Sequence, residues 1–228
     1  MKKQKKKEEK QGKKKEKQKE KQKKKKESRD TKDAGSFCKR QYNASWQYIK
    51  ESRQSIYAVI IVFAVFAIIG LIFPAPPELI EKIQEIVKEL LEAIEGKSTI
   101  GLISYIFVNN LGVSFFSLAF GVFFGIIPAI NAAVNGYFLG FVGGVVIGEV
   151  GFGELWRLLP HGIFELPAVF ISLGLGLRLG FFMLAAKPGE EFKRRAWESG
   201  RVFLFVVVPL LLIAAIIEGV LIGLTAAG

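Results

Sequence analysis

The sequence is poor in the residues on which most active sites and metal sites depend. Its 228 residues include one cysteine, Cys38, and one histidine, His161, so an intrachain disulfide and a multi-cysteine metal site are both excluded. A single histidine also excludes the HExxH motif of metalloproteases. Both aspartates, Asp30 and Asp33, lie near the N-terminus, which excludes an aspartyl intramembrane protease. GxSxG, P-loop and GxGxxG motifs are missing too, and we therefore expect neither an enzyme nor a cofactor.

The N-terminal tail lacks apolar side chains between Met1 and Ala34. Residues 1–33 hold 18 Lys and Arg against 7 Asp and Glu, which accounts for the whole net charge of +11 of the chain. A segment of this composition cannot bury enough surface to offset its ordering entropy. We therefore expect residues 1–35 to form a disordered cytoplasmic tail. Residues 1–33 could contact anionic lipids or the phosphates of RNA, for example in a ribosome.

Long apolar runs dominate the rest of the chain. A helix of about 20 apolar residues crosses the roughly 30 Å hydrocarbon core of a membrane. Runs of this kind predict five transmembrane helices, at about 56–73, 100–127, 132–150, 162–185 and 202–224. The predicted fold class is therefore all-α, a polytopic membrane helix bundle that extends over residues 56–228.

The segments around the first span have their own signals. Residues 36–55 mix aromatic with basic side chains and predict an interfacial approach anchored by Tyr42, Trp46 and Tyr48. Residues 78–95 place apolar side chains at helical spacing and fill the other face with Glu and Lys. This pattern predicts an amphipathic helix that is too charged to cross the membrane.

Two further connections are short or rich in glycine. The link Pro128–Asn131 between the second and third spans is short, which predicts a tight antiparallel hairpin. Residues 149–161 are mixed in character and predict either an interfacial or a re-entrant segment.

The orientation follows from the lysine and arginine residues of the short loops. Four basic residues precede the first span and five lie in Lys187–Arg201, whereas the loop 74–99 has three basic and six acidic residues. We therefore expect a protein of the cell membrane. The positive-inside rule then predicts that its N-terminus and Lys187–Arg201 lie on the cytoplasmic side. The amphipathic helix and the C-terminus are expected outside.

Glycines recur every four residues in the third span. Gly136, Gly140, Gly144 and Gly148 share one helix face, where small residues let helix backbones approach closely. The pattern predicts tight packing within the chain or, alternatively, the interface of a homodimer.

A few polar residues interrupt the apolar spans. They are Asn109, Asn110, Asn135, His161 and Glu165. Because ionisable groups inside a membrane are costly, they are functional candidates by default. His161 and Glu165 are four residues apart and share a helix face, so they could pair, bind a cation or relay a proton. The alternative is that they hydrogen-bond to asparagine side chains or to backbone freed near a proline.

Arg178 lies near the end of the fourth span, about 20 Å along the helix from Glu165. The two cannot pair, and we expect Arg178 to meet lipid headgroups at the inner surface.

The stretch LLPHGIFELPAVFISLGLGLRLG, residues 158–180, resembles the stage II sporulation protein M family. The resemblance continues upstream in VNNLGVSFFSLAFGVFFGIIPAINAAVNGYFLG, residues 108–140, and covers about 56–225. It implies an α-helical cell-membrane protein of five or six spans. Sporulation members of the family are scaffolds for cell-wall-degrading partners, and many relatives have no assigned role. The Lys- and Glu-rich composition is typical of thermophiles and favours an archaeal source. The family's motif residues map as follows: Asn109, Asn110, Asn135, Gly136, Pro160, His161, Gly162 and Glu165.

Three hypotheses follow for the function. The first is a non-enzymatic membrane scaffold that forms a homodimer and recruits membrane or extracytoplasmic proteins. The second is a transporter or channel subunit with a polar intramembrane site around Asn135, His161 and Glu165, and helices broken near Pro128 and Pro160. The third is a ribosome-tethered factor for membrane-protein biogenesis, which depends on the basic tail.

Overall fold

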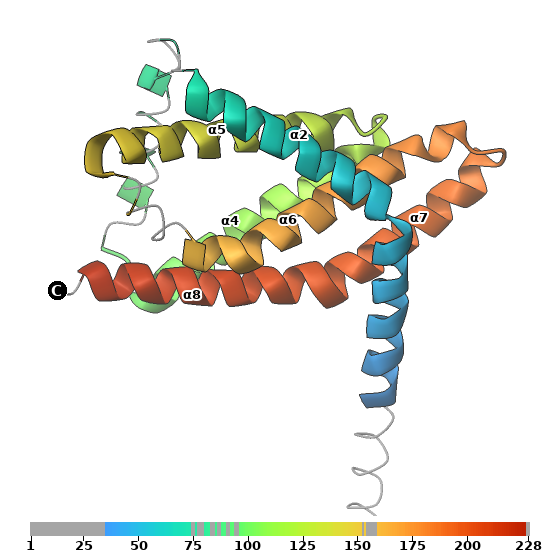
Figure 1. Cartoon of the computed structure of the whole chain (residues 1–228). Helices are drawn as coiled ribbons and strands as arrows, with labels where there is room; N and C mark the ends of the chain where they lie inside the picture. The colour runs from blue at the N-terminus through green and yellow to red at the C-terminus, as the bar shows by residue number, and fades with distance from the viewer. Residues whose placement is uncertain are drawn as a thin grey trace, which may run out of the picture. The chain divides into compact units, whose positions relative to one another are not determined.

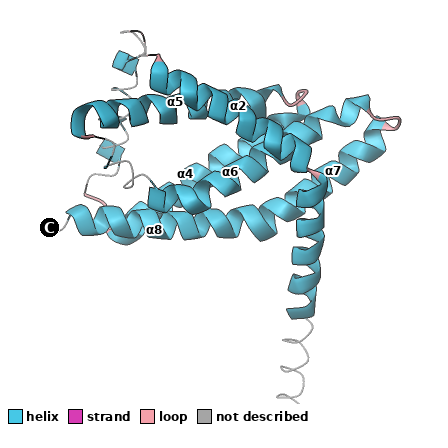
Figure 2. Cartoon of the chain, in the orientation of Figure 1, coloured by secondary structure: helices cyan, strands magenta, loops and turns pink. Residues whose placement is uncertain are grey.

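A computed structural model describes residues 35–73, 76, 80–82, 85, 88–89, 92–93, 96–151, 153 and 159–226. The expected tail therefore lies almost wholly outside the described residues. The contacts divide the chain into two compact units, Met1–Ala44 and Ser45–Gly228. The described residues of the first unit, 35–44, are helical. The second unit is a bundle of helices, and its described residues include no strand (Figure 2).

Six α-helices form the described bundle, together with shorter helical segments. The α-helices are α2 (Arg53–Ile72), α4 (Thr99–Ala119), α5 (Ile126–Val150), α6 (Leu159–Gly180), α7 (Pro188–Val202) and α8 (Val208–Ala226). The shorter segments are the 3-10 turns η1 (Phe120–Val122) and η3 (Phe181–Leu184) and the π-helix η4 (Phe203–Val207).

Five helical stretches are long and apolar enough to cross a membrane. Their bounds are Arg53–Ile72, Thr99–Val122, Ile126–Gly148, Gly162–Leu184 and Pro188–Leu224. The prediction of an all-α bundle with five spans is confirmed. Of the amphipathic helix expected over 78–95, residues 80–82, 85, 88–89 and 92–93 are helical. The rest of the expected helix lies outside the described residues, and so do residues 152 and 154–158 of the segment 149–161.

The turn between α4 and α5 comes earlier than the sequence suggested, and the prediction of a tight hairpin is wrong, because α5 packs mainly against α2 and hardly touches α4. The turn lies at Phe123–Gly125, not at Pro128–Asn131, and both Phe124 and Gly125 have positive φ, at 55° and 70°. Glycine reaches this left-handed region without steric cost, which makes it a good site for the chain to reverse. Pro128 lies in the first turn of α5, where the backbone N–H that proline lacks has no helical partner in any case.

Helix α6 occupies the centre of the bundle. It packs against α2, α4, α5, α7 and α8, and Figure 1 shows it between the α2–α5 pair and α8. Each of the three buried apolar clusters contains one or more α6 side chains: Leu175, Leu173 and Ala168. The fold therefore depends on α6 as the element that the other helices share.

The α2–α5 pair is packed through glycines. A methyl group at Gly136 would overlap the backbone carbonyl of Phe63, and one at Gly140 would overlap that of Ala67. Gly144 is in ordinary contact with Leu71, whereas Gly148 has nothing within 4 Å of an added methyl group. Three of the four glycines of the stripe therefore face α2 of the same chain.

Glycines also bring α4 close to α8 and α6. On α8, Gly219 packs on Ile103 and Gly223 on Thr99, so α4 and α8 run antiparallel. At the other end of α4, Gly121 packs directly against Gly176 of α6. Close backbone approach of this kind gives van der Waals contact that larger side chains would prevent.

The last span differs from a regular α-helix at η4. Pro209 lies two residues beyond η4 and lacks the N–H that would bond to the carbonyl four residues earlier. A π-turn is a common response to such a disturbance. The buried residues show the wider turn. Val202 and Val207 are five residues apart with no buried residue between them, whereas buried residues of an α-helix recur every three or four positions.

Replacement of Gly140 by alanine should destabilise the bundle. The new methyl group would meet the Ala67 carbonyl, and overpacking of this kind typically costs about 1–3 kcal/mol. The matched control is Gly148→Ala, which adds the same methyl group where nothing lies within 4 Å. Thermal unfolding in detergent should show a lower midpoint for Gly140→Ala alone. Equal midpoints would mean that the α2–α5 contact does not limit stability.

Candidate functional site

The asparagines of the predicted polar cluster form two separate small groups. Asn135 donates to the carbonyl oxygen of Asn131 at 2.9 Å and to its side-chain oxygen at 2.5 Å. Asn131 in turn donates to the hydroxyl of Ser117 on α4 at 2.8 Å. Asn109 and Asn110 contact each other at 3.5 Å on α4. The Asn135 group therefore joins α5 to α4, close to the turn between them.

Glu165 lies elsewhere in the bundle, on the side of α6 that faces α8. Its side chain is half-buried, and the carboxyl of Glu218 on α8 lies within electrostatic range. His161 belongs to the first turn of α6, and its side chain is outside the described residues. Pro128 and Pro160 lie in the first turns of α5 and α6 and interrupt neither helix, and residues 154–158, which precede α6, lie outside the described residues.

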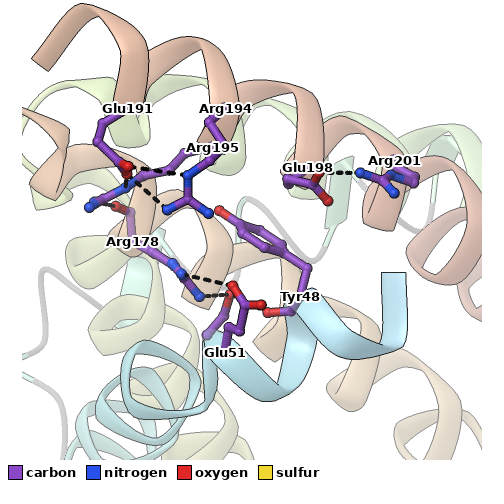
Figure 3. A network of polar contacts seen from close by, with 9 residues as sticks. Tyr48, Glu51, Arg178, Glu191, Arg194, Arg195, Glu198 and Arg201 are labelled. Carbon is purple, nitrogen blue, oxygen red and sulfur yellow. Dashed lines mark hydrogen bonds and ion pairs between the residues drawn. The ribbon is translucent and has the colours of Figure 1, made fainter. Parts of the chain in front are cut away.

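The most connected polar site is one that the sequence analysis missed. Arg178, in the last turn of α6, donates to the hydroxyl of Ser52 at 2.8 Å and pairs with Glu51 at 3.5 Å (Figure 3). Its guanidinium also lies over the ring of Tyr48, with the carbon 4.6 Å from the ring centroid. Ser52 closes the group by donating to the carbonyl oxygen of Tyr48 at 2.7 Å. We call Tyr48, Glu51, Ser52 and Arg178 the junction cluster.

Helix α7 joins this cluster through its own charged side chains. Arg195 donates to the carbonyl oxygen of Arg178 at 2.7 Å and to Glu191 at 2.9 Å. Glu191 also accepts two hydrogen bonds from Arg194, at 3.2 and 2.9 Å. One turn further on, Glu198 pairs with Arg201 (Figure 3). Bidentate contacts of arginine with carboxylate fix geometry as well as charge.

Two expectations about this region are wrong. Tyr48 is 3% exposed and packs with Leu118, Leu175 and Val202, so it is a core residue and not an interfacial anchor. Arg178 has a side chain that is 17% exposed and bonds to protein, so lipid headgroups are not its main partners. Burial raises the pKa of the Tyr48 phenol, against the opposing effect of Arg178, and the ring stays neutral.

A signal for the junction cluster was present in the sequence. Ser45, Tyr48 and Ser52 are spaced three and four residues apart, and all are buried. The same stripe continues into α2 with Ile56 and Val59. A helix is buried along the face on which its apolar and small residues recur. Residues 45–52 therefore pack with the bundle along this face, with a bend at Ser52 and α2 beginning at Arg53.

The junction cluster is suited to holding helices in place. It joins residues 48–52, α6 and α7 at one end of the bundle through hydrogen bonds, ion pairs and ring contacts. Among the described residues, no three His, Cys, Asp or Glu side chains gather as a metal site would require.

Five apolar helical stretches of spanning length, with α6 at their centre, define a multi-pass α-helical membrane protein. The sequence model of the family described as stage II sporulation protein M matches residues 59–221. This match covers most of the bundle, and the chain belongs to that family. Searches of curated proteins and of solved structures found no match.

Loss of the Arg178 side chain should loosen the end of the bundle. Arg178→Ala removes the partner of Ser52 and Glu51 and the contact with Tyr48, and we expect a loss of about 1–3 kcal/mol. Lys187→Ala is the control, because the Lys187–Glu190 pair is more than 70% exposed on both sides and should contribute little. Thermal midpoints in detergent test the difference. A double-mutant cycle with Glu51→Gln then isolates the coupling, and additive effects would contradict the ion pair.

Proposed function

We propose that this chain is a non-enzymatic membrane scaffold, which associates with itself and recruits partner proteins at the cell membrane. The observation that carries the proposal is the packing of the bundle. Glycines bring backbones into contact between α2 and α5, between α4 and α8, and between α4 and α6. Contacts this close leave the helices little freedom to slide or to open a path between them. A rigid body of this kind is suited to holding other proteins in place.

The candidate surface for recruitment is the free face of α7. One face of α7 is tied to the bundle by Arg195, Ser199 and Val202. On the opposite face Trp197 is 75% exposed, and Lys193 is exposed one turn away. Tryptophan is enriched among the residues that carry most of the energy of protein interfaces. The positive-inside rule places this face in the cytoplasm, on the same side as the basic tail.

The transporter hypothesis requires a water-accessible interior, whereas the scaffold proposal requires a closely packed one. A transporter needs water to reach Glu165 or Asn135, whereas the scaffold does not. In a Cys38→Ser background, a thiol introduced by Glu165→Cys or Asn135→Cys should resist a hydrophilic methanethiosulfonate reagent, because the reagent attacks the hydrated thiolate. The reference for free access is Lys50→Cys, and the reference for a lipid-facing position is Val113→Cys, both at exposed residues.

We expect Glu165→Cys and Asn135→Cys to react at the slow rate of Val113→Cys, at least about tenfold below Lys50→Cys. Rapid modification of both, slowed by an added solute, would overturn the scaffold in favour of transport. Lys50→Cys also tests the orientation, because a membrane-impermeant reagent should modify it only after the cell membrane is opened.

Recruitment itself can be tested with a photo-crosslinking amino acid. Placed at Trp197 in cells, it should yield discrete protein adducts, including adducts with a second copy if the chain self-associates. Placed at Tyr57, on the apolar surface of α2, it should yield far fewer. Mass spectrometry of the adducts identifies the partners. Equal, diffuse labelling from the two positions would count against α7 as the recruiting surface.

A further inference from the structure

A polar hollow lies beside the bend that leads into α2. Its volume is about 430 Å³, and it is lined by Gln47, Lys50, Glu51, Arg53 and Gln54. The bend itself is held by the junction cluster, because Ser52 and Glu51 are both bound to Arg178. The hollow therefore has a fixed floor at the point where the chain enters the membrane span.

The charges of the hollow favour an anion. Arg178 already engages the carboxylate of Glu51. Lys50 lies over the ring of Trp46, 5.9 Å from its centroid, and none of the ion pairs among the described residues involves it. Arg53 likewise belongs to none of the ion pairs within the described part of the chain. Two cations thus remain to bind a ligand, with the amide groups of two glutamines beside them.

An apolar stripe begins where the hollow ends. Tyr57 is four residues beyond Arg53 and is 60% exposed, and Ile61 follows at the same spacing, 62% exposed. Ile68 continues the stripe at 55%. Residues at this spacing share one face of a helix. One leaflet of a membrane is about 15 Å thick, which corresponds to about ten residues of α2, so the stripe is long enough to accompany an acyl chain.

We propose that the hollow binds the phosphate-bearing headgroup of an anionic membrane lipid, whose acyl chains lie along the stripe of Tyr57, Ile61 and Ile68. The stripe belongs to a membrane-spanning helix and is covered by acyl chains, so the phosphate group available next to the hollow is the headgroup of a lipid. Bound there, the lipid fixes the depth at which α2 enters the membrane.

Trp46 makes the binding measurable. Trp156→Phe and Trp197→Phe together leave Trp46, next to Lys50, as the single tryptophan. In phosphatidylcholine vesicles with increasing mole fractions of brominated phosphatidylglycerol, bromine quenches the fluorescence of a tryptophan that it contacts. Each basic residue near a membrane surface adds about 1 kcal/mol of attraction to anionic lipid. Because the hollow holds two such residues, we expect half-maximal quenching at a roughly 30-fold lower mole fraction than with brominated phosphatidylcholine.

Lys50→Gln combined with Arg53→Gln should abolish this preference. The matched control, Lys187→Gln with Lys193→Gln, removes two charges outside the hollow and should keep it. The proposal fails if both lipids quench equally, or if the control loses the preference as fully as the hollow variant. It also fails if millimolar glycerol phosphate displaces the lipid completely, because the hollow would then be a site for a soluble phosphate. None of these readouts depends on recruitment through α7.

Discussion

Backbone contact at glycine sets the distance between neighbouring helices in this bundle, and most other features follow from that distance. Lipid tails are as apolar as leucine, so burial of apolar surface does not drive helices together inside a membrane. Close van der Waals packing has to supply the attraction, and it requires small residues at the crossings. Gly136 and Gly140 provide it between α5 and α2, Gly219 between α8 and α4, and Gly121 with Gly176 between α4 and α6. These contacts leave α6 at the centre of the bundle, where it packs against α2, α4, α5 and α8.

Hydrogen bonds between side chains and neighbouring helices add to the glycine contacts at a few positions along the bundle. Ser172 of α6 donates to the carbonyl oxygen of Ser114 on α4 at 2.7 Å, and Asn131 reaches Ser117 near the turn between α4 and α5. Hydrogen bonds between membrane helices contribute modestly one by one. The charged groups of the junction cluster and α7 gather instead at one end, where Arg178 and Arg195 connect residues 48–52 and α7 to α6. Most of the contacts along the bundle are thus apolar, and ion pairs and charged hydrogen bonds hold the helices together at that end.

The sequence was a good guide to the spans and a poor guide to what joins them. Apolar runs predicted five crossing helices because membrane thickness imposes their length. The turn between α4 and α5 was misplaced because a proline was taken as the end of a helix, although proline is compatible with the first turn of the next one. The predicted tight hairpin does not form, because α5 packs mainly against α2, which is distant from it in the sequence. Arg178 was assigned to lipid because its partners, Tyr48 and Ser52, are 130 and 126 residues away in the chain. Contacts at such separations depend on how the helices pack against one another, and the spacing of residues within one helix does not predict that packing. Of the candidate polar residues, the positions in α4, α5 and α6 were predictable, and their division into separate groups was not.

The π-helical turn η4 lies between α7 and α8, and it changes which side of this continuous helix faces the bundle. An α-helix advances about 100° per residue, so the wider turn rotates the face of α7 relative to that of α8. Arg195 and Ser199 can thereby face the charged end of the bundle while Leu211 and Ala215 face its apolar interior. Removal of one residue from 203–207 would restore a regular helix and turn α7 by about a quarter of a circle. The length of this short segment therefore determines that Trp197 faces away from the bundle, and a chain that is one residue shorter here would expose a different face of α7.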